Sequence, residues 1–181
     1  MAEFSIGSLK VRVCFGFFAA VMFYFYFSGE DSAGVAAALL SCFLHELGHL
    51  SAMFLFGCPP ERLTLYAGGL RLTGSYTKQP SRPQELVILS AGCAVNLALA
   101  VISHFIGAQT LALVNLSLML TNLLPFSALD GGRILALFGS RLRKTAAAVT
   151  AVLLAAAVYH FGLSPCAMLF IAFAAVFELF A

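Results

Sequence analysis

The chain has 181 residues, of which 61% are hydrophobic and only 10% are charged. Soluble domains carry about a quarter of their residues as charged side chains, so this composition excludes an ordinary water-soluble fold. The formal net charge of +2 gives no indication of a nucleic-acid partner. The expected class is an integral membrane protein in which residues 1–181 form a single domain within the lipid bilayer.

Six apolar stretches are each long enough, or nearly so, to cross a bilayer as a helix, which predicts an all-α polytopic fold. In chain order they cover residues of about 11–28, 33–56, 85–106, 108–124, 145–159 and 165–180. Lys10 and Arg12 lie at the start of the first stretch, as basic residues do in a signal peptide, but no cleavage motif follows. It is therefore expected to remain as an uncleaved helix.

The positions of the basic residues predict the orientation in the membrane. All ten Lys and Arg fall at or before the start of the first span, between the second and third, or between the fourth and fifth. With six spans these three regions lie on one side, and basic residues are retained on the cytoplasmic side. Both termini are therefore expected in the cytoplasm.

The longest polar connection, residues 57–83, follows the second span. Leu63 and Leu65, then Leu70 and Leu72, alternate around a glycine-containing turn, which predicts a short β-hairpin. Such a hairpin can bind an extended substrate peptide as an added strand. The alternative is a plain amphipathic loop.

The second span contains the sequence H-E-x-x-H. His45 and His49 are four residues apart, so they share one face of a helix and can bind one Zn²⁺ between them. Glu46 can take a proton from a metal-bound water, whose pKa zinc lowers. Each ionisable group at this depth costs about 2.5–3.5 kcal/mol. Because the span holds no Lys or Arg to pair with Glu46, helix packing alone does not explain that residue.

A catalytic zinc takes three protein ligands and keeps one open position, so a third ligand must come from elsewhere. His104 and His160 have a suitable side chain, but both are expected near the non-cytoplasmic ends of their spans. Asp130 is the better candidate, because it follows Pro125, which interrupts the fourth span. The alternative is an ordinary Asp-Gly turn where the helix leaves the membrane.

Two asparagines are further candidates. Gly92 and Asn96 are four residues apart in the third span, and glycine allows helices to approach closely. Asn96 either donates a hydrogen bond to a substrate carbonyl or links two helices, and the residues leave both alternatives open. Asn122, beside the break at Pro125, is expected to help position substrate.

The order of these motifs resembles the site-2 protease family of intramembrane zinc metalloproteases, peptidase M50. The motifs are H-E-x-x-H in the second span, G-x-x-x-N in the third and N-x-x-P-x-x-x-L-D-G after the fourth, and the resemblance covers a catalytic core of about residues 33–140. The resemblance implies a zinc cofactor with His45, His49 and Asp130 as ligands, Glu46 as general base, and Asn96 and Asn122 as substrate-positioning residues.

No PDZ domain is expected after the second span and no CBS domain after the sixth, which makes the chain most similar to the stage-IV sporulation subgroup. That similarity implies a bacterial cell membrane, a membrane-anchored pro-sigma factor as substrate and a regulatory membrane protein as partner. Cys93 and Ala128 stand where many relatives have proline. Neither departure alters an expected zinc ligand.

Two other functions fit parts of the pattern. A catalytically silent relative would bind single-span membrane proteins without cutting them, but binding alone does not require Glu46. A metal transporter would use the histidines and Glu46 for transport, but it favours a continuous polar path and repeated halves. The sequence shows neither of these features.

Overall fold

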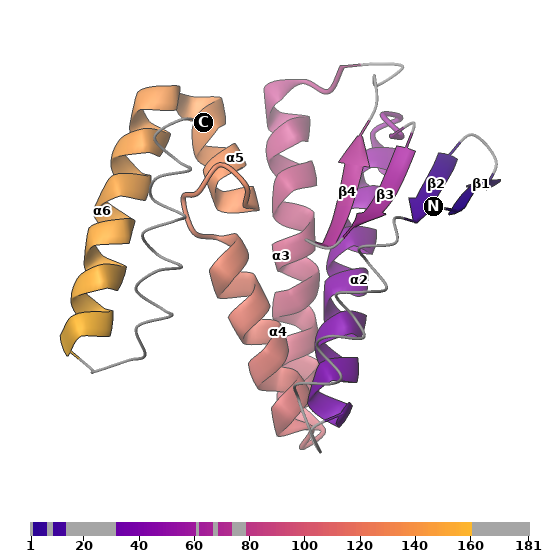
Figure 1. The fold of residues 1–181 in the computed structure, drawn as a ribbon. Coiled ribbons are helices and arrows are strands. Elements are labelled where there is room, and N and C mark those ends of the chain that lie inside the picture. The colour runs from indigo at the N-terminus through magenta and orange to yellow at the C-terminus, as the bar shows by residue number, and fades with distance from the viewer. Residues whose placement is uncertain are drawn as a thin grey trace. The chain divides into compact units, whose positions relative to one another are not determined.

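In the computed structural model (Figure 1), the described residues are 2–6, 9–13, 32–60, 62–66, 69–73 and 79–160. They belong to two compact units, Met1–Met119 and Leu120–Ala181. The sixth expected span lies outside the described residues, and so does the first from residue 14 onward.

Two long helices, α2 (Ser32–Leu55) and α3 (Arg82–Phe105), lie side by side in the first unit (Figure 1). Each has 24 residues and is therefore about 36 Å long, enough to cross a hydrocarbon core of about 30 Å. Within the described residues, two helical segments are long and apolar enough to span a membrane, Ala33–Leu55 and Arg82–Phe105. They correspond to the second and third expected spans.

Helix α3 has clear start and stop signals. Gln84 Oε1 accepts a hydrogen bond from the backbone N–H of Ser81 at 2.9 Å, and Pro83 occupies the first turn, where its missing N–H costs nothing. Beyond the last turn, Gly107 adopts a φ of +79°, a conformation that glycine takes readily. These signals fix the length of the helix that faces α2.

The first unit also contains a four-stranded sheet in the order β1-β2-β3-β4. The strands are β1 (Ala2–Ile6), β2 (Leu9–Val13), β3 (Arg62–Tyr66) and β4 (Gly69–Thr73). Strands β3 and β4 are antiparallel, with Leu63 opposite Leu72 and Leu65 opposite Leu70. They occupy the stretch for which the sequence predicts two short strands.

The prediction of an all-α fold with one short hairpin is wrong in one respect, because β1 and β2 add a second antiparallel pair. Strand β2 reads Leu-Lys-Val-Arg-Val, an alternation of apolar and basic residues that is typical of a strand with one buried face. These residues were expected to form the flank and start of the first span. The fold is mostly helical with a small sheet.

The last described helices are α4 (Gln109–Asn122), α5 (Asp130–Phe138) and α6 (Ser140–His160). Helix α4 covers most of the fourth expected span but has 14 residues, or about 21 Å of helix. Helix α6 contains the fifth expected span and begins before it. Within the second unit, α5 and α6 are in contact, and Gly139 with a φ of +148° allows the bend between them.

Candidate metal centre

Helix α2 presents His45 and His49 towards α3, with 5% and 6% of their surfaces exposed. Their Nε2 atoms are 3.1 Å apart. Two nitrogens bound to one tetrahedral zinc at about 2.0–2.1 Å would be about 3.3–3.4 Å apart. The two imidazoles are therefore oriented and spaced as a single zinc ion requires.

The hydrogen-bond partner of the His49 ring fixes which of its nitrogens can bind a metal. Its Nδ1 lies 2.7 Å from the backbone carbonyl oxygen of Ile88. A carbonyl oxygen only accepts hydrogen bonds, so Nδ1 carries the hydrogen and donates it. The lone pair of His49 is then on Nε2, which is the tautomer needed for a metal ligand through that atom.

His45 has a different neighbour in the corresponding position. Its Nδ1 lies 3.2 Å from Nδ2 of Asn96, a fully buried residue of α3. A functional Asn96 was predicted, but its contact with His45 was not. The spacing of Gly92 and Asn96 places Asn96 on a helix face that can approach a neighbour, but it does not identify the partner.

Two glycines allow α2 and α3 to approach closely enough for this arrangement. A Cβ at position 92 would overlap Nε2 of His49 and lie 2.7 Å from Nε2 of His45. A Cβ at position 48 would lie 2.9 Å from the carbonyl oxygen of Ala91. Gly92 therefore provides the space that the imidazole rings occupy, and Gly48 provides space for the backbone of α3.

Asp130 begins α5 and is 7% exposed. The segment between α4 and α5 contains the buried Pro125 and folds against the first turn of α5. A Cβ at Gly131 would overlap the carbonyl of Leu123, and one at Gly132 would overlap that of Phe126. The break predicted at Pro125 is present, and the two glycines let the irregular segment pack against the turn that holds the Asp130 carboxylate.

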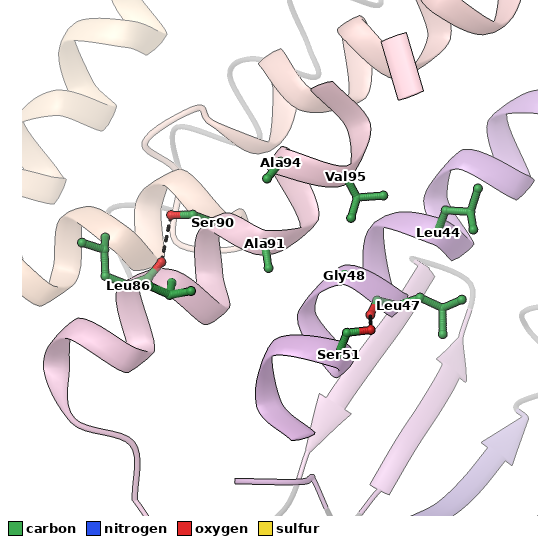
Figure 2. A pocket seen from close by; sticks show the side chains of 10 residues that line it. Leu44, Leu47, Gly48, Ser51, Leu86, Ser90, Ala91, Ala94 and Val95 are labelled. Carbon is green, nitrogen blue, oxygen red and sulfur yellow. Dashed lines mark hydrogen bonds between the residues drawn. The ribbon is translucent and has the colours of Figure 1, made fainter. Parts of the chain in front are cut away.

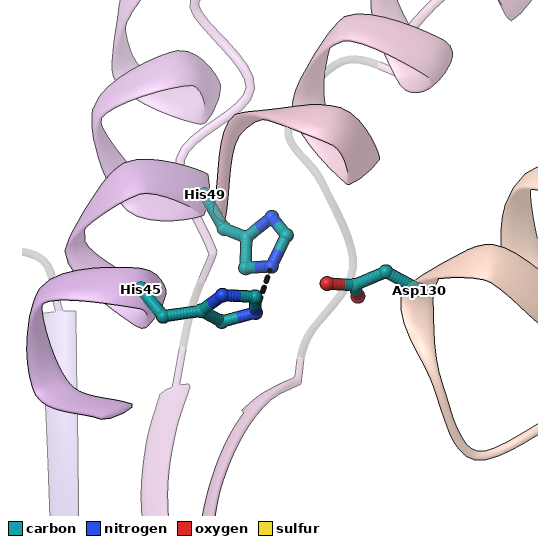
Figure 3. A group of neighbouring side chains, drawn as sticks. All are labelled: His45, His49 and Asp130. Carbon is teal, nitrogen blue, oxygen red and sulfur yellow. Dashed lines mark hydrogen bonds between the residues drawn. The ribbon is translucent and has the colours of Figure 1, made fainter. Parts of the chain in front are cut away.

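Figure 3 draws the side chains of His45 and His49, which belong to the first unit, and of Asp130, which belongs to the second. Each residue offers one possible ligand atom, and all three are buried. Two imidazoles and a carboxylate are a donor set that suits Zn²⁺ and leaves a position open. The residues present therefore fit a zinc ion.

The other predicted residues lie as follows. Glu46 follows His45 in α2 and is partly buried, and Asn122 is the last residue of α4 and is also partly buried. His104 and His160, the disfavoured candidates for the third ligand, are both exposed and lie outside the group in Figure 3.

A groove of about 700 Å³ lies along the same two helices (Figure 2). Its two hydroxyl-bearing residues are Ser51, which donates to the carbonyl of Leu47 at 2.7 Å, and Ser90, which donates to that of Leu86 at 2.8 Å. The remaining lining is apolar, and no predicted site residue belongs to it. The groove is therefore an apolar surface of the helix pair and provides no groups for catalysis.

Comparisons with known proteins find similarity to metalloproteases. The model of peptidase family M50 matches residues 108–163, which include Asp130. A protein of Synechocystis sp. that carries the name zinc metalloprotease is 34% identical over 119 residues, or 56% of this chain and 31% of the relative. The chain thus spans less than a third of that relative. The solved site-2 protease of Methanocaldococcus jannaschii has a TM-score of 0.67 and 25% identity, covering 98% of this chain and 94% of that one.

Proposed function

The chain belongs to the site-2 protease family of zinc metalloproteases, peptidase family M50, and from this premise we propose that it hydrolyses a peptide bond of a membrane-anchored protein, in or beside its transmembrane segment. The observation that carries the proposal is the pair of buried Nε2 atoms 3.1 Å apart, with Glu46 next to the first histidine. A pair of histidines held for packing would not need that carboxylate.

Each site residue has a proposed role. His45, His49 and Asp130 hold the zinc ion, and Glu46 is the general base. When bound, the ion lowers the pKa of a water molecule and polarises the substrate carbonyl. Glu46 accepts the proton of the attacking water and delivers it to the amine that leaves. The burial of the three ligands keeps bulk water away and strengthens these electrostatic interactions.

For the fold in the membrane, we propose a single domain with six spans, a catalytic core of about residues 33–140 and both termini in the cytoplasm. The grouping of all ten basic residues in three regions supports this orientation. The site would then lie in the cytoplasmic half of a bacterial cell membrane.

For the substrate, we propose that an extended peptide pairs with β4, which is an edge strand of the sheet. A helical substrate segment must unwind before cleavage, because helical hydrogen bonding occupies its carbonyl groups. Asn122 and Asn96 are proposed to position the peptide, as the family resemblance implies. Within the family, a membrane-anchored pro-sigma factor is the proposed substrate and a regulatory membrane protein the proposed partner.

Co-expression of this protein with a tagged pro-sigma factor from the same genome tests the proposal. Wild type is compared with Glu46→Gln, which keeps a similar shape but cannot act as the base. A product with wild type alone is the expected result. Equal product with both variants would mean that another protease cuts the substrate. Wild-type protein that retains zinc but cuts no member of a panel of single-span proteins would favour the catalytically silent relative.

A further inference from the structure

Asn96 has a feature that substrate positioning does not explain. It is 0% exposed, its Nδ2 lies 3.2 Å from Nδ1 of His45, and its Oδ1 has no hydrogen-bond partner in the part of the chain that the structure describes. We propose that Asn96 is a positioning residue for His45. Its Oδ1 accepts a hydrogen bond from Nδ1–H of His45 and thereby fixes the tautomer in which His45 binds the metal through Nε2. The inference rests on the proposed zinc site but not on any substrate.

The hydrogen bonds around the two histidines are mutually consistent as the structure places their atoms. His49 donates from Nδ1 to the carbonyl of Ile88, so its Nε2 is an acceptor. His45 can then donate from its Nε2 to that of His49 across 3.1 Å. Its Nδ1 is left as the acceptor for the Nδ2 amide hydrogen of Asn96. Each of these three contacts pairs a donor with an acceptor.

Metal binding reverses the role of His45. A zinc ion needs the lone pairs of both Nε2 atoms, so the ring hydrogen of His45 must be on Nδ1. Two donors would then face each other across the contact with Asn96. A half-turn of the amide exchanges Nδ2 and Oδ1 within the same volume and restores a donor–acceptor pair. The turn also gives a partner to the buried Oδ1, which otherwise has none among the described residues.

Asn115 provides the contrast. It is also 0% exposed and has a buried Oδ1 without a partner in the described residues, but its Nδ2 donates to the carbonyl of Leu111 in its own helix at 2.9 Å. Of these two buried asparagines, Asn96 is the one hydrogen-bonded to an imidazole nitrogen of a proposed ligand. A role limited to linking helices would not require this particular partner.

The test measures zinc affinity in the purified full chain in detergent, by competition with a chromophoric chelator. Asn96→Leu keeps the branching and the number of non-hydrogen side-chain atoms but cannot accept a hydrogen bond, and loss of a hydrogen-bond partner of a metal ligand costs about 10–100-fold in metal affinity. Asn96→Asp keeps an acceptor for Nδ1–H, so its affinity is expected to equal or exceed that of wild type. Asn115→Leu, the matched control, is expected to leave zinc affinity unchanged. The absorption spectrum of bound Co²⁺ is expected to change with Asn96→Leu and not with the control.

Wild-type zinc affinity in Asn96→Leu would overturn the inference, and so would an equal loss in Asn96→Leu and Asn115→Leu. If Asn96→Leu fails to fold, Asn96→Asp decides alone: retained affinity supports the inference and a tenfold loss overturns it. Wild-type protein that binds no zinc would overturn the proposed function together with this inference. Wild type that binds zinc and cleaves substrate, with Asn96→Leu unaltered in zinc affinity, would overturn the inference alone.

Discussion

Replacing Gly92 with alanine tests the geometry of the histidine pair. The added Cβ would overlap Nε2 of His49 and lie 2.7 Å from Nε2 of His45, where ordinary van der Waals contact begins at 3.4 Å. The ring of His45 would have to retreat by about 0.7 Å, although metal–ligand distances tolerate only about 0.2 Å. Overpacking of this kind costs about 1–3 kcal/mol. If that cost falls on the zinc-bound state, affinity drops by roughly 5- to 150-fold.

The assay is zinc competition on purified Gly92→Ala in detergent, with thermal unfolding measured in the metal-free protein. Ala94→Val is the control, because Ala94 belongs to the same helix but is exposed and lines the apolar groove. We expect the control to bind zinc as wild type does. Wild-type affinity in a folded Gly92→Ala protein would refute the placement of the two imidazoles against residue 92.

Three further predictions concern the other parts of the site. Asp130→Ala should weaken zinc binding by more than Asn96→Leu does, because it removes a ligand rather than a ligand's partner; a smaller effect, in the same competition assay, would remove Asp130 from the ligand set. Treatment with a strong zinc chelator should stop cleavage and added zinc should restore it, whereas cleavage at the untreated rate would exclude a zinc-dependent reaction. Gly131→Ala should lower the free energy of unfolding by about 1–3 kcal/mol, because its Cβ meets the backbone carbonyl of Leu123; unfolding at the wild-type temperature would contradict the close packing of that turn.

The features of the site that local spacing determines could be predicted from the sequence. Helical periodicity alone brings His45 and His49 to one face, within reach of one another, and the structure places their Nε2 atoms 3.1 Å apart. The interruption at Pro125 also follows from local chemistry, since proline cannot continue the hydrogen bonding of a helix. Helix α5, which begins at Asp130, was not among the expected elements.

Features that depend on contacts between distant segments could not be predicted in this way. Strand β2 pairs in parallel with β3, which lies far along the chain beyond α2, so its short alternating pattern was outweighed by the apolar stretch that follows it. The contact between Asn96 and His45 depends on how α3 is rotated against α2. The sequence places both residues in spans, but it does not give that rotation.

We propose that this protein cuts a membrane-anchored protein with a zinc ion held by the His45 and His49 pair and with Glu46 as the base. The most direct test measures zinc content and substrate cleavage in the same preparations of wild type and Glu46→Gln, reconstituted in lipid vesicles. We expect one zinc ion per chain in both proteins and cleavage with wild type alone. Cleavage by both proteins, or by wild type without zinc, would contradict this proposal.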